Sequence, residues 1–384
     1  MKKTIYFWSP HLTNVGTVRS TLNSAAAFAK FSKNRFDVKI IDVFGEWEEY
    51  NEILKKNNIK KINLTINYKK LLPKYGFIYS RFSYIVIMLV SLFPLLLLLV
   101  KKKPDYFIIH LLTSLPLFLF KIFNFHSKII LRISGKPKLN VFRTLLWKLV
   151  NNIIFKITCP TEKLVSQLTI NKIFISNKIF HLPDPVIDIK DYLLKKNLTP
   201  ESYKFNKEPF LLSVGRFTRQ KNYTYLINEY EKFTKNYNKL NLVIIGDGEE
   251  KIKIEKLIIK KNLQNKIYLT GYEDNFYFFM NKASAFILPS LWEELGLAIV
   301  QAAMSNTVII SSDCPHGPAE FLNNGQTGIL FRNNQKDELY NSLVFFVKNE
   351  NLLKTKRIIA KKNSLNYTKF RHHKIFSKIL NIQN

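Results

Sequence analysis

Residues 285–312 read "AFILPSLWEELGLAIVQAAMSNTVIISS", in which three apolar runs are separated by short polar segments. The first run, "AFILP", and the last, "TVIISS", are short and apolar, which is typical of strands in a parallel sheet covered on both faces. The middle run, "LAIVQAAM", follows a loop with two acids and a glycine, and we expect it to be a helix. The stretch therefore predicts a strand–helix–strand unit of an α/β domain.

The same alternation continues outward from this unit. Upstream of it, strands are expected in "FLLSVGRF", "LNLVIIG" and "KIYLTG", with helices in "YTYLINEYEKFTKNY", "KIKIEKLIIKKN" and "NFYFFMNKA". Nearer the N-terminus, strands are expected in "TIYFW", "DVKIIDVF", "YFIIHL" and "KIILRIS", with a helix in "TLNSAAAFAKF". We therefore expect the α/β class, with two Rossmann-like domains and a ligand cleft at the carboxyl ends of their parallel strands.

The domain boundaries follow from length and composition. A chain of 384 residues is too long for one ordinary core, so two domains are expected. We place an N-terminal domain over 1–186, a polar interdomain connection over 187–208 and a second domain over 209–360. The last segment, 361–384, is expected to form a helix that packs back on the N-terminal domain.

Composition bounds the class of protein. The chain is 47% hydrophobic and 23% charged, as a folded protein is. Cys159, Cys314 and seven scattered histidines give neither a metal-finger spacing nor a disulfide framework, so we expect a reducing compartment. The start, "MKKTIYFWSP", turns polar within ten residues, and a secretory signal is not expected there.

The net charge of +31 favours an anionic partner such as nucleic acid, anionic lipid or a phosphorylated substrate. The alternative is a general drift of composition toward Lys, Asn and Ile, which are abundant throughout the chain.

Residues 84–100, "YIVIMLVSLFPLLLLLV", are uncharged, mostly apolar and flanked by basic residues. Seventeen residues of helix reach about 25 Å, against roughly 30 Å for a hydrocarbon core. A single crossing would put the strands before and after it on opposite sides of the membrane, and a hairpin with "FIIHLLTSLPLFLFKIF" would use up a strand. We expect either a core helix or one that dips into the membrane surface, with its basic flanks on anionic headgroups.

Two of the cations on the loop in "SVGRFTRQKN" are candidates for an anion site. A strand ends at Val214, Gly215 gives a turn, and Arg216 and Lys221 follow. At the carboxyl end of a strand and in front of a helix, an Arg fork and a Lys point charge suit a diphosphate. The alternative is two solvated basic residues in a basic protein.

Glu293 and Glu294 lie on the loop between "AFILP" and a helix that begins near Gly296. A carboxylate there can be a helix N-terminal cap, or it can accept hydrogen bonds from sugar hydroxyls at the edge of the cleft. Gln301, on the helix, is expected to face the same cleft. Gly16, before the first helix, is either a simple turn or a point where a phosphate approaches the backbone.

These segments resemble, in order and spacing, the retaining glycosyltransferases of family 4, which have the GT-B fold. The resemblance is carried by "VGRFTRQKN", "LVIIGDGEE", "YLTGYEDN", "FILPSLWEELGLAIVQAA" and "VIISSDCPHGPAEFL". It implies that Arg216 and Lys221 hold the donor diphosphate and that Glu293, the first carboxylate of an E-x7-E motif, contacts the donor sugar. It also implies backbone amides near the sugar or phosphate at Gly296 and Leu297, and Gly16 beneath the donor phosphate.

The chain departs from the family pattern at two places. Gln301 stands where the second glutamate of the motif is expected, so an acceptor oxygen for the ribose is kept but its charge is lost. A histidine common in the family is absent from "IILRISGKPK", which has Arg132 instead. His110, at the end of the preceding strand, is expected on the acceptor side with Arg132, or else to be a hydrogen-bonded core histidine.

The resemblance implies an enzyme that transfers a hexose, with retention, from a nucleotide-diphosphate sugar to a lipid-linked or cell-surface glycan. No Asp-x-Asp metal motif appears where a donor diphosphate would need one, so no metal and no cofactor are expected. The alternatives are a GT-B sugar-nucleotide epimerase and a catalytically weak partner subunit of a glycosyltransferase. A nucleic-acid-binding protein is a further alternative, which the sequence disfavours because it shows no recognised nucleic-acid-binding module. We expect a cytoplasmic protein, peripheral at the inner face of the cytoplasmic membrane.

Overall fold

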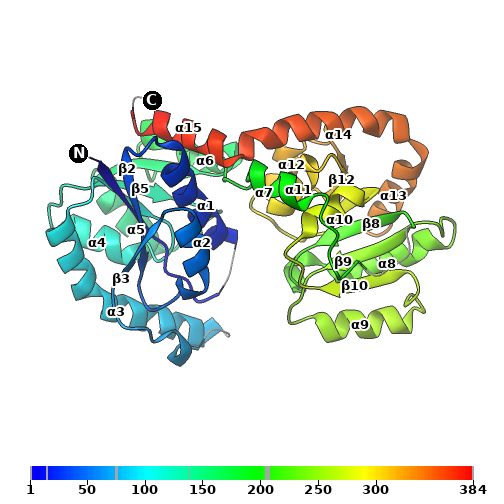
Figure 1. The fold of residues 1–384 in the computed structure, drawn as a ribbon, viewed down its shortest axis with the longest axis horizontal. Helices are drawn as coiled ribbons and strands as arrows, with labels where there is room; N and C mark the ends of the chain where they lie inside the picture. Colours follow the sequence, from blue (N-terminus) through cyan, green and yellow to red (C-terminus); the bar gives the residue numbers. More distant parts are fainter. Residues whose placement is uncertain (1, 14–15, 74–76, 138, 204–207, 383–384) are drawn as a thin grey trace. The chain divides into compact units, whose positions relative to one another are not determined.

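Parallel strands form the centre of both halves of the chain in the computed structural model, which describes residues 2–13, 16–73, 77–137, 139–203 and 208–382 (Figure 1). The chain divides into unit 1, Met1–Pro185 with Lys369–Asn384, and unit 2, Val186–Thr368. All strand pairs in the described ranges are parallel. The expected α/β class with two parallel sheets is confirmed.

Unit 1 has a seven-stranded sheet in the order β3-β2-β1-β4-β5-β6-β7. Its strands are β1 Lys3–Trp8, β2 Phe36–Asp42, β3 Lys60–Asn63, β4 Tyr106–Ile109, β5 Lys128–Arg132, β6 Ile154–Cys159 and β7 Ile179–His181. Its helices are α1 Gly16–Phe31, α2 Asn51–Lys56, α3 Phe77–Lys102, α4 Ser114–Ile122, α5 Val141–Val150, α6 Glu162–Ile170 and α15 Lys369–Ile379, with short 3₁₀ turns η1 Glu48–Tyr50, η2 Lys69–Leu71 and η3 Ser176–Lys178. The strand order reverses between β1 and β4, and α1 begins at the carboxyl end of β1.

The sheet of unit 1 is covered on both faces because its strands are apolar at successive positions. In β1, Tyr6 and Trp8 pack in a core with residues of α3, α4, α5 and α6. Ile5 and Phe7 point to the other face, where α1, α2 and α15 cover the sheet. Successive side chains of a strand alternate between faces, so these two cores are what an all-parallel sheet requires.

Helix α3 is longer than the apolar segment expected at 84–100, and it has one buried face and one exposed face. Ile87, Ser91, Leu95 and Leu99, spaced four residues apart, are buried in the core of unit 1. By length and composition alone α3 is apolar enough to cross a membrane. Because β1 and β4 are neighbours in the sheet and one face of α3 packs on that sheet, α3 is a covering helix of unit 1.

Helix α15 belongs to unit 1 although it lies near the end of the chain. His372 contacts Ser24 of α1 at 2.8 Å, and the rings of Phe376 and Phe28 are 5.2 Å apart. Both phenylalanines are buried, so α15 closes the core on the α1 face of the sheet.

Unit 2 has a six-stranded sheet in the order β10-β9-β8-β11-β12-β13. Its strands are β8 Phe210–Val214, β9 Asn241–Ile245, β10 Ile267–Gly271, β11 Ala285–Leu288, β12 Val308–Ser312 and β13 Ile329–Phe331. Its helices are α7 Ile189–Lys195, α8 Tyr223–Thr234, α9 Lys251–Lys260, α10 Phe276–Lys282, α11 Leu297–Met304, α12 Gly317–Phe321, α13 Glu338–Lys348 and α14 Glu350–Ser364, with 3₁₀ turns η4 Arg219–Lys221 and η5 Leu365–Tyr367. The strand order reverses between β8 and β11, which is where ligands bind in open α/β sheets.

The segment 187–208, where a polar connection is expected, contains α7. Tyr192 of α7 is buried against Tyr277 of α10, with ring centroids 5.3 Å apart. Residues 204–207 of this segment lie outside the described residues.

Candidate functional site

The loop after β8 carries the two cations expected to bind a diphosphate. The strand ends at Val214, and Lys221 ends the 3₁₀ turn η4. Asn222 follows with φ 55°, a left-handed conformation that asparagine tolerates, and α8 starts at the next residue. Arg216 is exposed, whereas the side chain of Lys221 is only 17% exposed.

Lys221 and Glu293 form an ion pair between the loops that follow β8 and β11. The Nζ of Lys221 contacts Oε1 of Glu293, and the hydroxyl of Ser290 donates to the same oxygen at 2.7 Å. Glu293 is 8% exposed. Because taking a carboxylate out of water costs several kcal/mol, it needs these two partners. The structure thus brings together two predicted site residues from the two strands at which the sheet order reverses.

Hydrogen bonds to the backbone hold these two loops together around the ion pair. The amide of Leu291 donates to the carbonyl of Gln220 at 2.8 Å, and the side chain of Gln220 donates to the carbonyl of Trp292 at 2.8 Å. From β12, the hydroxyl of Ser312 donates to the carbonyl of Ser290 at 2.6 Å. The positions of Lys221 and Glu293 are therefore fixed by hydrogen bonds between the segments that carry them.

Gly246, in the "GDG" turn after β9, packs against the loop that follows β8. A Cβ atom at this position would lie 1.9 Å from the carbonyl oxygen of Gly215. The amide of Gly215 donates to the carbonyl of Ile245 at 3.0 Å, so the two turns are in direct contact. The glycine is needed because the backbone of the β8 loop lies against it.

Helix α11 begins beside the ion pair. Gly296 is its N-cap and Leu297 its first residue, so their amides are among those left without partners inside the helix. Gln301 is half-buried and lies four residues after Leu297, hence on the same face of α11. Glu294 is exposed, as expected of a charge at a helix start. Two cations and a helix N-terminus favour an anion here, and Glu293 adds an acceptor for hydroxyl groups.

In unit 1, Gly16 is the first residue of α1 and is exposed. Residues 14 and 15 of the expected phosphate loop lie outside the described residues. The role predicted for Gly16 beneath a phosphate stays a prediction.

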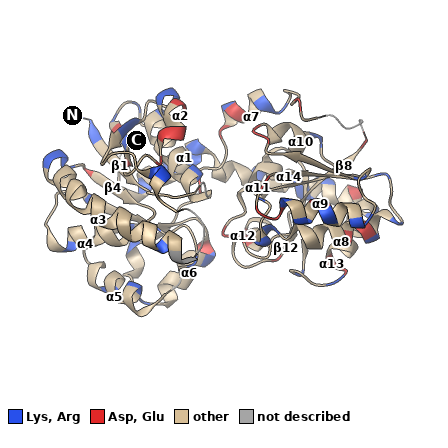
Figure 2. Cartoon of the chain, turned by 90° about the horizontal axis from the view of Figure 1, so that it is seen from below, with Lys and Arg blue, Asp and Glu red and all other residues tan. Residues whose placement is uncertain are grey.

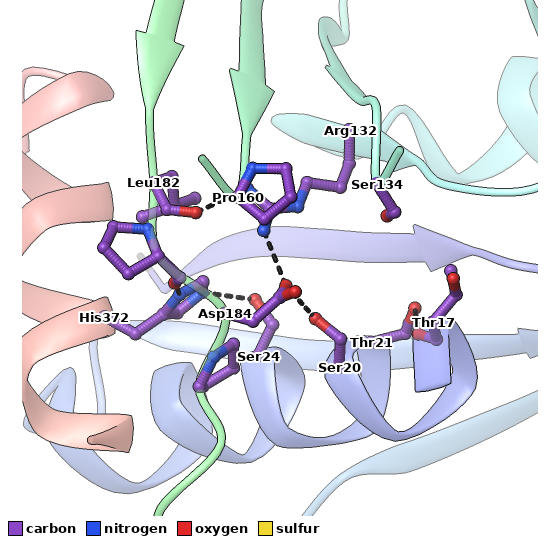
Figure 3. A network of polar contacts seen from close by, with 12 residues as sticks. Thr17, Ser20, Thr21, Ser24, Arg132, Ser134, Pro160, Leu182, Asp184 and His372 are labelled. Atoms are coloured by element: carbon purple, nitrogen blue, oxygen red, sulfur yellow. Dashed lines mark hydrogen bonds and ion pairs between the residues drawn. The ribbon is translucent and has the colours of Figure 1, made fainter. Parts of the chain in front are cut away.

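Arg132 lies in a buried polar network of unit 1 (Figure 3). Its guanidinium donates to the carboxylate of Asp184 at 2.6 Å and to the carbonyl of Leu182 at 2.8 Å. The hydroxyl of Ser20, in the second turn of α1, donates to the same Asp184 oxygen. Burial is the largest influence and would raise the pKa of Asp184, but the charge of Arg132 and the hydrogen bonds from Ser20 and Arg132 together outweigh it, and the pKa is lowered. The Arg132 charge is thus matched inside unit 1, and its acceptor-side role stays a prediction.

His110 lies in the same region, at the end of β4. Its ring contacts the hydroxyl of Thr21 and, at 2.6 Å, that of Ser134. Burial and the nearby charge of Arg132 lower its pKa to about 3, so the ring is neutral at pH 7. A small cavity of about 10 Å³, roughly the space of one water molecule, lies between His110, Arg132 and His372. His110 thus has the surroundings of a hydrogen-bonded core histidine. Its predicted place on the acceptor-substrate side stays a prediction.

Three residues of these sites were not expected from the sequence. Ser290 fixes Glu293, while Asp184 and Ser20 fix Arg132. The short segment "PDP" around Asp184 marks a rigid turn with one acid, which is the only local signal for it.

Comparison with known proteins agrees with the resemblance in unit 2. Residues 195–363 match the family of glycosyl transferases group 1. An uncharacterized glycosyltransferase of Methanocaldococcus jannaschii is 38% identical over 127 residues, which are 33% of this chain and 30% of the relative. An N-acetylgalactosamine-N,N'-diacetylbacillosaminyl-diphospho-undecaprenol 4-alpha-N-acetylgalactosaminyltransferase of Campylobacter jejuni is 28% identical over 155 residues, or 40% of this chain and 42% of the relative. The chain therefore matches less than half the length of these relatives.

Solved structures are similar over the whole chain. A glycosyltransferase from Rickettsia africae superposes with a TM-score of 0.77 at 18% identity and covers 100% of both chains. HepE of Anabaena, solved in complex with UDP, superposes with a TM-score of 0.73 at 12% identity, again over 100% of both chains. At these identities the likeness shows the fold, which is the GT-B fold expected from the sequence.

Proposed function

We propose that the protein is a retaining glycosyltransferase of family 4, because residues 195–363 match the glycosyl transferases group 1 family and the chain has the GT-B fold. It moves a hexose from a nucleotide-diphosphate sugar to a lipid-linked or cell-surface glycan. The observation that carries this proposal is the Lys221–Glu293 ion pair at the carboxyl edge of the unit 2 sheet, with Arg216 exposed on the same loop.

The cations of this site serve the leaving group. When the bond between the anomeric carbon of the sugar and the diphosphate oxygen breaks, negative charge grows on that oxygen. Lys221 and Arg216 stabilise that charge, and the loop contacts that fix Lys221 mean that little reorganisation is needed at that moment. We expect no metal ion and no cofactor in this step.

Glu293 and Gln301 serve the sugar and the nucleoside. One oxygen of the Glu293 carboxylate accepts from Lys221 and Ser290, and the proposed role of the other is to accept from sugar hydroxyls. The side-chain amide oxygen of Gln301, on the face of α11 shared with Leu297, accepts a hydrogen bond from a ribose hydroxyl. The amides of Gly296 and Leu297 complete the donor site.

The acceptor is proposed to be membrane-borne. The name of the Campylobacter jejuni relative describes an acceptor carried on undecaprenol diphosphate. A lipid-linked glycan would be presented at the inner face of the cytoplasmic membrane, where we place this protein.

A thermal-shift screen over UDP-, GDP- and ADP-sugars tests the donor site. A donor at 100 times its dissociation constant should stabilise the fold by about 2.7 kcal/mol and raise the melting temperature. Lys221→Ala and Glu293→Ala should each abolish this shift and lower transfer at least about 100-fold. Lys261→Ala, which removes a comparable ion pair to Glu231 of α8, should leave both unchanged.

Two outcomes contradict the proposal. If Lys221→Ala and Glu293→Ala bind donor and transfer sugar like the wild type, the site assignment is wrong. If the donor sugar is isomerised equally with and without any acceptor, the protein is an epimerase.

A further inference from the structure

Positive charge is concentrated in unit 1. Unit 1 has 33 Lys and Arg against nine Asp and Glu, whereas unit 2 has 26 against 19. Of the net charge of +31, 24 charges therefore belong to unit 1 and only seven to unit 2. General drift of composition would charge both units alike, so an anionic partner of unit 1 is the better explanation.

Within unit 1 the imbalance is greatest in one continuous segment. Residues 53–161 contain 19 Lys and Arg and a single acid, Asp105. The carboxylate of Asp105 accepts hydrogen bonds from the amide and the hydroxyl of Thr4, at 2.8 and 3.0 Å, at the amino-terminal end of the sheet. This segment supplies α3, α4 and α5, none of which contains an acidic residue.

The outward face of α3 is apolar. Large apolar side chains recur along it every three or four residues, and Leu89 is 65% and Phe93 61% exposed. The stripe comprises Phe82, Ile85, Leu89, Phe93, Leu97 and Val100. It runs opposite the stripe of α3 that is buried in the core, and it ends at the exposed cations Lys101 and Lys102.

The apolar face continues over two neighbouring helices. Helix α4 packs against both α3 and α5, and all three cover the same face of the unit 1 sheet. In Figure 2 they lie along one side of unit 1, tan with patches of blue. The exposed apolar residues are Phe118 and Ile122 on α4, and Val141, Phe142, Leu145 and Leu149 on α5. The cations Lys121 and Lys148 lie among them, both exposed.

We propose that these outward residues of α3, α4 and α5 form one basic apolar surface by which unit 1 docks on an anionic lipid bilayer. The apolar side chains enter the boundary between headgroups and acyl chains, and the lysines contact lipid phosphates. This specifies the membrane contact of the proposed function, although the docking itself does not depend on the sugar that is transferred.

Charge and chemistry favour a bilayer over other occupants of this surface. Two copies that met face to face would bring two units of +24 together, which opposes association. A nucleic acid would match the charge but would leave the apolar stripe of α3 against phosphates. An anionic bilayer is the one partner that matches both the cations and the apolar side chains.

Because Leu95 and Leu99 hold α3 in the core of unit 1, the helix lies in the plane of the membrane surface. Spanning would require α3 to leave the sheet that it covers. The docking is therefore peripheral and reversible, and it is set by three helices of one folded unit.

Vesicle co-sedimentation of the full chain, without sugar nucleotide, tests the surface. The protein should bind phosphatidylcholine vesicles containing 30% phosphatidylglycerol at least about tenfold more strongly than pure phosphatidylcholine. Leu89→Gln with Phe93→Gln on α3, and Phe142→Gln with Leu145→Gln on α5, should each lower the partition coefficient about tenfold. Lys101→Gln with Lys102→Gln should lower it about fivefold per charge, and less so at high salt.

Matched controls lie on α9 of unit 2. Ile252 and Ile259 are 67% and 58% exposed, and Lys256 and Lys260 are exposed on the same helix. Replacing either pair by Gln should leave vesicle binding unchanged. All of the substituted side chains are at the surface, so every variant should keep the wild-type circular dichroism and melting temperature.

Three outcomes would overturn the inference. One is equal binding of the α3 or α5 variants and the wild type. Another is equal loss of binding in the α9 controls, which would mean that any apolar or cationic side chain suffices. The third is a dimer of the wild type that the α3 variant converts to monomer, since a second copy would then cover the surface. None of these results bears on donor binding, so the proposed reaction is judged separately.

Discussion

The guanidinium of Arg132 lies 2.6 Å from the carboxylate of Asp184, and both side chains are buried in unit 1. Asp184 follows β7 and also accepts from Ser20 of α1, so this one ion pair joins β5, the end of β7 and α1. The start of α1, where a donor phosphate is expected, is thereby tied to the sheet through its second turn.

Asp184→Asn should destabilise unit 1 strongly. The variant leaves Arg132 buried without a countercharge, and breaking a buried pair in this way costs about 3–5 kcal/mol. Denaturant unfolding at pH 7, followed by tryptophan fluorescence, measures the loss. Asp37→Asn is the matched control, because Asp37 pairs with Lys39 and Lys60 near the surface and its loss should cost about 1 kcal/mol or less. Equal effects of the two substitutions would contradict the role given to the buried pair.

The buried histidines should make the protein less stable in mild acid. Burial lowers the pKa of His110 and of His372 to about 3, against an ordinary value near 6.5. Below pH 6.5 the unfolded chain binds protons that the folded one does not, so stability is complete above about pH 6.5 and falls toward pH 3. Each histidine contributes a slope of about 1.4 kcal/mol per pH unit in that window.

The slope is measured from melting temperatures between pH 7.5 and pH 5. His372→Gln, which keeps a hydrogen bond to Ser24 or to the carbonyl of Pro183, should lose less stability over this range than the wild type. His126→Gln removes an exposed histidine from the turn before β5 and should keep the wild-type slope. A wild-type slope in His372→Gln would contradict the prediction.

Lys221 and Glu293 should be coupled in stability as well as in donor binding. Lys221→Met removes the cation that pairs with the buried Glu293 carboxylate and leaves the hydrogen bond from Ser290, and we expect a loss of about 3 kcal/mol. In the double variant Lys221→Met with Glu293→Gln neither charge remains, so much of the loss should be recovered. A double-mutant cycle on unfolding free energies measures the coupling, which should exceed about 1 kcal/mol. Additive effects would show that the ion pair does not form in solution.

Gly246→Ala should abolish donor binding, because it displaces the loop after β8 in addition to straining the backbone at residue 246. The new methyl group would lie 1.9 Å from the carbonyl of Gly215 and would push the loop that carries Arg216 and Lys221. Gly271→Ala is the control, since Gly271 also has a positive φ, of 74°, but has no atom within 4 Å of the added carbon. We expect the donor-induced thermal shift to vanish in the first variant and to persist in the second, whose melting temperature falls only through backbone strain of about 1 kcal/mol. Equal donor shifts in both would remove the supporting role of Gly246.

The strands with unbroken apolar runs were predictable from the sequence, whereas β6, which has a lysine within it, and the shortest strands were not. β9 and β11 are buried at every position, so "NLVII" and "AFIL" carry their own signal. β3 begins with two lysines, and β7 and β13 have three residues each, so no local pattern separates them from loops. They are strands because a neighbouring strand in the sheet offers them hydrogen bonds.

The candidate site was predictable where one residue sits beside one strand end, and less so where two distant residues meet. Arg216, Lys221 and Glu293 follow strand ends and could be placed on one edge. The ion pair of Lys221 with Glu293 and that of Arg132 with Asp184 join residues that are 72 and 52 positions apart. No spacing rule gives such pairs, because they depend on how loops fold over a sheet. The same limit applies to α3, whose outward face could not be told from its core face before the packing of the sheet was known.

The position of α15 has a consequence for the order in which the protein is made. The contact of Ser24 with His372 joins residues 348 positions apart, and unit 1 lacks part of its core until α15 has been synthesised. Unit 2 is continuous from Val186 to Thr368 and is translated in between, which takes about 10–40 s at roughly 5–20 residues per second. During that interval the nascent unit 1 exposes the apolar residues that α15 later covers, Phe28 among them. The second unit can thus complete its fold on the ribosome before the first, and chaperones that shield apolar surface would act on the N-terminal half of the chain.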